Sequence, residues 1–140
     1  MSPPLTHVVM LPDRIELIAP NMPPDIRRWF LERDYAKPSY EHQDWDASLA
    51  EWDFVPLLSE YIEDPLNPIE KRFEAFSALM ILRTLDPKES EAHKKLNQEI
   101  RKIVLATPDF ARKVSAEWLR LPEARVVARI LGEETPQDLP

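Results

Sequence analysis

The sequence predicts an all-α fold, a compact bundle of about five to seven short helices. Two observations lead to this prediction. From residue 24 to residue 131, apolar side chains recur every three to four positions, which is the period of an amphipathic helix. Prolines stand where several of these periodic segments begin, and the first turn of a helix tolerates proline well. HEAT-like helix pairs are one arrangement that such a bundle adopts.

The chain has the length of one domain, at 140 residues. We therefore expect a single helical domain over residues 1–132, with helices at residues 24–131 and a frayed C-terminal tail at residues 133–140. Residues 1–20 are the exception within this domain. There, "HVVML" and "IELIA" flank "PDR" and predict a short β-hairpin or an extended segment.

Capping sequences mark where the longer helices begin. In "NPIE" and "DPKE", an amide or carboxylate side chain is followed by proline and, two residues later, by glutamate. Asn67 and Asp86 are therefore predicted to cap helices that start at the following prolines. "TPDF" and "LPEA" repeat the proline placement and predict two further starts. The single glycine, Gly132, is placed to end the last helix.

Shorter helices are predicted between residues 24 and 64. One begins near Pro24 and directs Ile26 and Phe30 inward. Another begins at Asp46, which is predicted to be its cap. Pro56 either kinks this helix or opens a new one, because proline removes a backbone donor from the helix interior.

Composition excludes several kinds of functional site. The chain has no cysteine, which rules out disulfides and thiolate chemistry. It has one glycine, whereas phosphate-binding loops, dinucleotide fingerprints and nucleophile elbows need several. No apolar run approaches the roughly 20 residues that cross a bilayer, and the N-terminus lacks the features of a secretory signal. We therefore expect a cytoplasmic protein without a membrane partner.

The acidic charge is concentrated in one segment. The net charge of the chain is −7, and residues 35–64 contain eight carboxylates but only one base, Lys37. The acids are Glu41, Asp44, Asp46, Glu51, Asp53, Glu60, Glu63 and Asp64. A surface of one sign attracts and orients a partner of the opposite sign. The segment therefore predicts a binding surface for a protein with a basic face.

Large aromatic side chains lie in the same segment. Tyr40 and Trp45 precede the helix predicted to begin at residue 46, so the helical spacing gives no reason to place their rings in the core. Aromatic rings among carboxylates are typical anchors of a protein interface. The predicted partner-binding residues are Tyr40, Glu41, Asp44, Trp45, Asp46, Glu51, Asp53 and Glu60.

The alternative for this segment is an ordinary solvated helix face. Large rings in small domains are mostly buried, and Trp52, Phe54 and Tyr61 are better explained as core residues. On this interpretation the carboxylates only keep the outer face in water. The sequence leaves both interpretations of the segment open.

No motif indicates catalysis, a cofactor or a metal ion. His7, His42 and His93 lie in no catalytic or zinc-binding pattern, and the acids beside His42 lack a recognised ligand spacing. Nucleic acid is an unfavourable partner for an acidic chain, because phosphate contact needs a basic face. We therefore expect a protein that is not an enzyme, has no cofactor and binds no nucleic acid.

These observations favour a small acidic interaction module that binds, and inhibits or neutralises, a partner with a basic surface. In size, charge and helicity the chain is similar to the immunity proteins of bacterial toxins and to antitoxins, in which an acidic helical protein covers a cationic site. A helical-repeat adaptor or assembly subunit with an apolar groove is the alternative, and a small enzyme is a third. The partner and the oligomeric state do not follow from the sequence.

Overall fold

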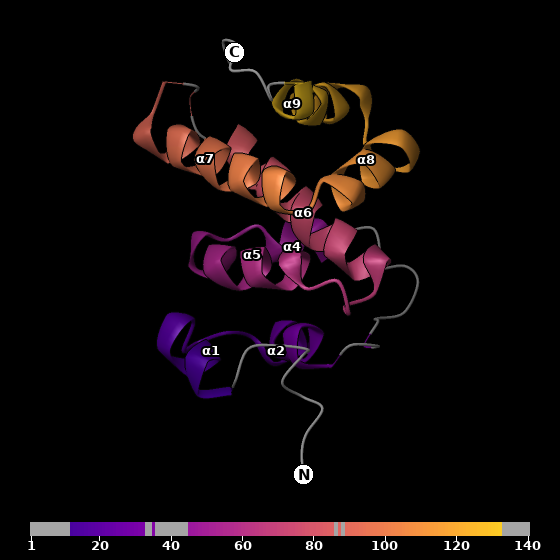
Figure 1. The fold of residues 1–140 in the computed structure, drawn as a ribbon. Coiled ribbons are helices and arrows are strands. Elements are labelled where there is room, and N and C mark those ends of the chain that lie inside the picture. The colour runs from indigo at the N-terminus through magenta and orange to yellow at the C-terminus, as the bar shows by residue number, and fades with distance from the viewer. Residues whose placement is uncertain (1–11, 33–34, 36–44, 86, 88, 133–140) are drawn as a thin grey trace. The chain divides into compact units, whose positions relative to one another are not determined.

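Figure 1 shows the computed structural model, which describes residues 12–32, 35, 45–85, 87 and 89–132. Within these residues every regular element is a helix, so the predicted all-α class is confirmed. The elements are α1 (Pro12–Ile18), α2 (Pro24–Leu31), α4 (Trp45–Leu49), the 3₁₀ helix η2 (Trp52–Phe54), α5 (Val55–Glu63), α6 (Ile69–Thr84), α7 (Glu91–Ala106), α8 (Pro108–Glu117) and α9 (Leu121–Leu131).

The chain divides into two compact units, Met1–Leu85 and Asp86–Pro140. The first contains α1 to α6 and the second contains α7 to α9. Each unit has its own set of buried apolar side chains. The single domain expected over residues 1–132 therefore stays a prediction, and the units are described separately.

Helix α6 forms the centre of the first unit, where it packs against α4 and α5. Its buried residues, among them Ala75, Phe76 and Leu79, are distributed around the helix, as expected for a segment that is apolar on most sides. The aromatic part of this core joins α2 to α5. The ring centroids of Trp29 and Tyr61 are 4.7 Å apart, and Trp29 meets Phe30 edge to face at 5.1 Å.

Two consecutive basic residues in the first turn of α6 hold the ends of two other helices. Lys71 Nζ donates hydrogen bonds to the carbonyl oxygens of Trp29, at 2.6 Å, and Glu32, at 2.7 Å, at the C-terminal end of α2. Arg72 Nε donates to the carbonyl oxygen of Ile62, at 2.7 Å, in the last turn of α5. The last carbonyls of a helix lack intrahelical partners and carry partial negative charge, so both buried cations stabilise these ends.

The start of α6 differs from the prediction in its capping. The helix begins at Ile69 with Pro68 as its N-cap residue, and no side chain caps it. Asn67 is buried, and its Nδ2 donates instead to the carbonyl oxygen of Tyr61 at 3.0 Å. The carbonyl of Tyr61, near the end of α5, also accepts from the amide of Asp64, and it thus competes successfully for the Asn67 side chain. Pro56 lies in the first turn of α5, so it opens a new helix rather than kinking an earlier one.

The starts of α7, α8 and α9 agree with the prediction in part. The start predicted at residue 87 is wrong, because α7 begins at Glu91, where the Ser90 side chain accepts from the amide of His93 at 3.1 Å. A serine cap closer to the apolar stripe replaces the predicted one. Helices α8 and α9 begin within one residue of their prolines, as predicted. Gly132 is the C-cap residue of α9, with φ of −79°.

The core of the second unit lies between three helices. Helix α9 contacts both α7 and α8, and α7 also contacts α8. The predicted stripe on α7, which includes Leu96, Ile100 and Val104, is buried, and Val114 of α8 and Val127 of α9 are buried with no exposed surface. In neither unit is a described helix long and apolar enough to cross a membrane.

The predicted N-terminal hairpin is wrong where the structure describes it. Pro12 begins α1, so "PDR" starts a helix instead of forming a turn. The amide of Ala19 donates to the carbonyl oxygen of Ile15 at 2.8 Å, and both residues are buried. This bond joins an amide to the carbonyl four residues earlier, which is the hydrogen-bond pattern of an α-helix and not of a strand. The other predicted strand, "HVVML", lies outside the described residues.

Candidate functional site: an acidic pocket beside η2

The predicted anchor Trp45 is a core residue, so its assignment to the interface is wrong. Its side chain is only 2% exposed, and its ring lies 6.3 Å from the ring of Trp29 and 6.0 Å from that of Tyr35. The other predicted anchor, Tyr40, lies outside the described residues together with Glu41 and Asp44. The predicted aromatic anchors therefore do not define the site.

The burial of Trp45 follows from where α4 begins. The helix starts at Trp45 itself, so Trp45 and Leu49 are four residues apart on one face, and both are buried. Asp46 consequently lies inside the first turn and is not the cap residue that the sequence predicted. Its Oδ1 accepts from the amide of Ala47 at 2.8 Å, and its Oδ2 accepts from Ser77 Oγ on α6 at 2.9 Å. Asp46 thus helps to fasten α4 to α6.

Glu60 also has a partner within the chain. Its carboxylate forms an ion pair with the guanidinium of Arg14 on α1, and both side chains are partly exposed. Exposed ion pairs of this kind contribute little to stability. The pair nevertheless neutralises one acid of the segment, so Glu60 is a weaker candidate for partner binding than the sequence suggests.

Glu51 and Asp53 are the predicted site residues that the structure leaves exposed and outside any ion pair with another described residue. They stand on either side of Trp52, at the start of η2. Trp52 is 40% exposed, so the interpretation of this ring as core is wrong, whereas Phe54 and Tyr61 are buried as predicted.

The exposure of Trp52 has a backbone cause. Helix α4 ends at Leu49, and Glu51 is extended, with φ of −133° and ψ of 140°. The helical spacing that would place Leu49 and Trp52 on one face therefore does not apply across this break. The break projects Trp52 and its two acidic neighbours from the surface, where the sequence pattern alone had placed a continuous helix.

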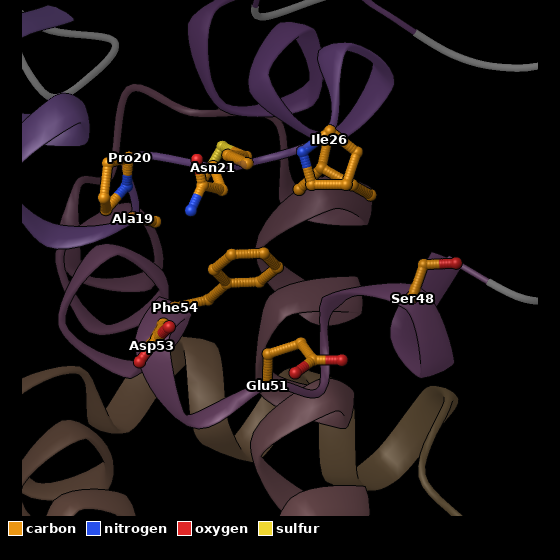
Figure 2. A pocket seen from close by; sticks show the side chains of 10 residues that line it. Ala19, Pro20, Asn21, Ile26, Ser48, Glu51, Asp53 and Phe54 are labelled. Atoms are coloured by element: carbon orange, nitrogen blue, oxygen red, sulfur yellow. The ribbon is translucent and has the colours of Figure 1, made fainter.

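A pocket of about 310 Å³ lies beside these acids (Figure 2). The residues that line it come from the connection between α1 and α2, from α2, from α4, and from the segment between α4 and α5. They are Ala19, Pro20, Asn21, Met22, Pro23, Ile26, Ser48, Glu51, Asp53 and Phe54. This volume is at the low end of the range for ligand pockets, about 300 to 1,000 Å³.

The wall of the pocket opposite the acids is built by a proline-rich turn. In "APNMPP", residues 19–24, prolines restrict the backbone, and the amide of Met22 donates to the carbonyl oxygen of Ala19 at 3.1 Å. Met22 and Ile26 are both buried and line the pocket, so this wall is apolar. Sequence reasoning missed this wall because these residues are more than twenty positions from the acids, and no motif connects the two segments.

The lining joins an apolar wall to two carboxylates. Figure 2 shows the ring of Phe54 between the segment that carries Asn21 and Ile26 and the side that carries Glu51 and Asp53. No basic side chain is among the residues that line the pocket. Nor do the described residues include a group of three or more His, Asp or Glu side chains that could hold a metal ion. The pocket thus has the chemistry to receive an organic cation with an apolar part.

Comparison of the chain with known protein families, with curated proteins and with solved structures yields no match. The fold and the site together define an all-α protein with an acidic pocket on its first unit. Function is a property of the site rather than of the fold class, so the chemistry of this pocket and of Trp52 carries the functional conclusion.

Proposed function

We propose that this protein is a small acidic interaction module that binds, and thereby inhibits or neutralises, a protein partner with a basic surface, in the way that immunity proteins and antitoxins do. The observation that carries the proposal is the exposure of Glu51, Trp52 and Asp53 in succession beside the pocket. These three residues are called the η2 surface below.

The η2 surface combines the two contributions that such an interface uses. Its carboxylates attract a basic partner over a distance and reject acidic competitors, which raises the association rate and the specificity. Trp52 supplies a large ring, and rings of this kind contribute much of the affinity once a partner excludes water from them. Trp52 therefore replaces Trp45 as the aromatic anchor of the proposal.

An adaptor that binds through apolar surface is a second candidate, favoured by the second unit. Among the described residues of this unit, three large apolar side chains are exposed, at the end of α7, just after α8 and at the start of α9. They are Leu105, Trp118 and Leu121. Such an interface would not depend on salt or on the η2 surface, because hydrophobic association is not screened by ions.

Affinity purification of the tagged protein from its native host at about 50 mM and about 200 mM salt tests the proposal, because salt screens exposed charges. We expect a stoichiometric basic protein that co-purifies at the lower salt concentration and is lost at the higher one. The double variant Glu51→Gln/Asp53→Asn should lose this protein at both concentrations.

A matched control removes the same amount of charge elsewhere. Glu70 and Glu89 are exposed, line no part of the pocket and, like the two acids of the η2 surface, form no ion pair with a described residue. The variant Glu70→Gln/Glu89→Gln should retain the partner. If both double variants lose the partner equally, the effect is one of net charge and not of the η2 surface. If both retain the partner, the interface lies elsewhere than the η2 surface.

A further inference from the structure

The pocket beside η2 is shaped for one side chain rather than for a large ligand. Its volume of about 310 Å³ is bounded by Met22, Ile26 and Phe54, all of them buried, and by the exposed Glu51 and Asp53. An alkyl chain that lies against the first three would be removed from water, which stabilises it by about 25 cal/mol per Å² of apolar surface. The same entering group would reach the two carboxylates at its polar end.

The charge of the pocket selects a cation. Both carboxylates are exposed and form no ion pair with a described residue, and the lining contains no basic side chain that would neutralise them from within. Residues 35–64, to which both acids belong, carry the full net charge of the protein, −7. This negative charge repels an anionic ligand and does not attract a neutral one, whereas it attracts a basic side chain.

Among basic side chains, arginine fits this lining best. Its guanidinium donates in several directions and therefore hydrogen-bonds two carboxylates at once, whereas the lysine ammonium is a compact, strongly hydrated charge. A guanidinium also stacks on aromatic rings, and the ring of Phe54 stands between the two walls (Figure 2). Asn21 also belongs to the lining, and its side-chain amide has an oxygen that can accept a further hydrogen bond.

From this geometry we infer that the pocket receives a single arginine side chain of the partner, with its alkyl stem against Met22, Ile26 and Phe54 and its guanidinium between Glu51 and Asp53. The inference rests on the proposed function, since it names the group by which a basic partner is recognised. It makes the pocket the source of specificity, and the neighbouring Trp52 contributes to affinity outside it.

Nuclear magnetic resonance titration of the whole protein tests the inference without knowledge of the partner. The probe is arginine blocked at both ends, as the N-acetyl amide, and the comparison compounds are the corresponding lysine and citrulline derivatives. Citrulline has nearly the shape of arginine but no charge. We expect the arginine probe to shift the amide signals of Met22, Ile26 and residues 51–54, and to bind about tenfold or more tightly than citrulline, with lysine between them.

Two kinds of variant distinguish binding in the pocket from general attraction to an acidic surface. Glu51→Gln/Asp53→Asn should weaken arginine binding about tenfold or more, because charge-assisted hydrogen bonds are lost. Glu70→Gln/Glu89→Gln should leave it unchanged. Asn21→Trp, at an exposed position of the lining, should weaken it by filling the pocket while both carboxylates remain. Unchanged binding in Asn21→Trp would overturn the inference, as would equal binding of arginine and citrulline or shifts confined to other regions.

The same materials distinguish failure of this inference from failure of the proposed function. If the basic partner is captured in a salt-dependent way but arginine does not shift the pocket signals, the inference is wrong and the proposed function stands. If arginine binds in the pocket but no basic partner is captured at either salt concentration, the proposed function is wrong, and the role assigned to the arginine falls with it.

Discussion

The ammonium group of Lys71 lies 4.6 Å from the centre of the Trp29 ring and donates a 2.6 Å hydrogen bond to the carbonyl oxygen of the same residue. The Trp29 ring in turn donates through Nε1 to Glu74 Oε1 at 3.1 Å. One residue of α2 is thus held by two residues of α6, one at its backbone and one at its ring. This relationship explains how a buried lysine is tolerated, because its charge is paired with helix-end carbonyls and aromatic faces.

Replacing Lys71 by methionine should lower the free energy of unfolding by about 2 to 3 kcal/mol, since hydrogen bonds to a charged group contribute about 1.5 to 3 kcal/mol and the carbonyls of Trp29 and Glu32 each lose a charged donor. Methionine keeps the apolar stem, so lost packing contributes little. Urea unfolding followed by circular dichroism measures the difference. The control Lys94→Met alters an exposed lysine of α7 and should stay within about 0.5 kcal/mol of the original protein. Similar midpoints for both variants would contradict this role of Lys71.

Arg72 should stabilise the end of α5 to a similar extent. Arg72→Met removes the hydrogen bond to the Ile62 carbonyl and should cost about 2 kcal/mol, with faster hydrogen exchange in the last turn of α5. Burial lowers the pKa of the Arg72 guanidinium, and the nearby carboxylate of Asp64 opposes this effect. Arginine stays protonated far above neutral pH, so the cost should be constant between about pH 6 and pH 9. Arg125→Met, at an exposed position of α9, is the control.

The two tryptophans of the acidic segment should respond in opposite ways. Trp45→Ala should lower the free energy of unfolding by about 3 to 5 kcal/mol, because it leaves a cavity in the core. Trp52→Ala should change stability by less than about 1 kcal/mol, since its ring is half exposed. With a captured partner, calorimetry should show that Trp52→Ala costs about 2 kcal/mol or more of binding free energy. A Trp52→Ala variant that binds as before would remove this ring from the interface.

The pair formed by Arg28 and Glu32 predicts a pH dependence. Arg28 Nε and Nη2 donate to the two carboxylate oxygens of Glu32 at 3.1 Å and 2.9 Å, and these hydrogen bonds lower the pKa of Glu32. Because the pKa in the folded state lies below that of the unfolded chain, the pair stabilises the fold above the ordinary glutamate pKa of about 4.3. This contribution is lost as the pH falls through the lowered value.

Arg28→Gln should therefore raise the pKa of Glu32 towards its ordinary value. Carbon-detected titration of the Glu32 carboxyl group measures this directly. Arg27→Gln removes the neighbouring guanidinium, which pairs with Glu16 instead, and should leave the titration of Glu32 in place. Equal pKa values in the original protein and in Arg28→Gln would show that the hydrogen bonds do not persist in solution.

Local patterns predicted much of the fold. Apolar spacing indicated the helices from residue 24 onward, and prolines located the starts of α2, α8 and α9. Apolar spacing and proline placement both depend on residues within one or two helical turns, so a single sequence is enough to detect them. The predicted strand over residues 15–19 failed because a short apolar segment fits both periods, and its burial pattern alone does not distinguish them. The helix is identified by its backbone, in which the amide of Ala19 donates to the carbonyl oxygen of Ile15.

The candidate site was only half predictable. The concentration of acids in residues 35–64 can be read from the sequence. It identified Glu51 and Asp53 as candidates without any knowledge of the fold. The opposite wall, with Met22 and Ile26, comes from a separate segment, and no local signal states that two such segments meet.

The sequence by itself determined the all-α class, the places where most helices begin and the acidic character of one segment, because each depends on residues that are neighbours in the chain. Tertiary structure decided which of two tryptophan rings is exposed. Trp45 and Trp52 have the same side chain and similar acidic neighbours, yet packing against α2 buries the first and a break after Leu49 exposes the second. Burial is set by what other segments cover, and that information is spread over the whole first unit.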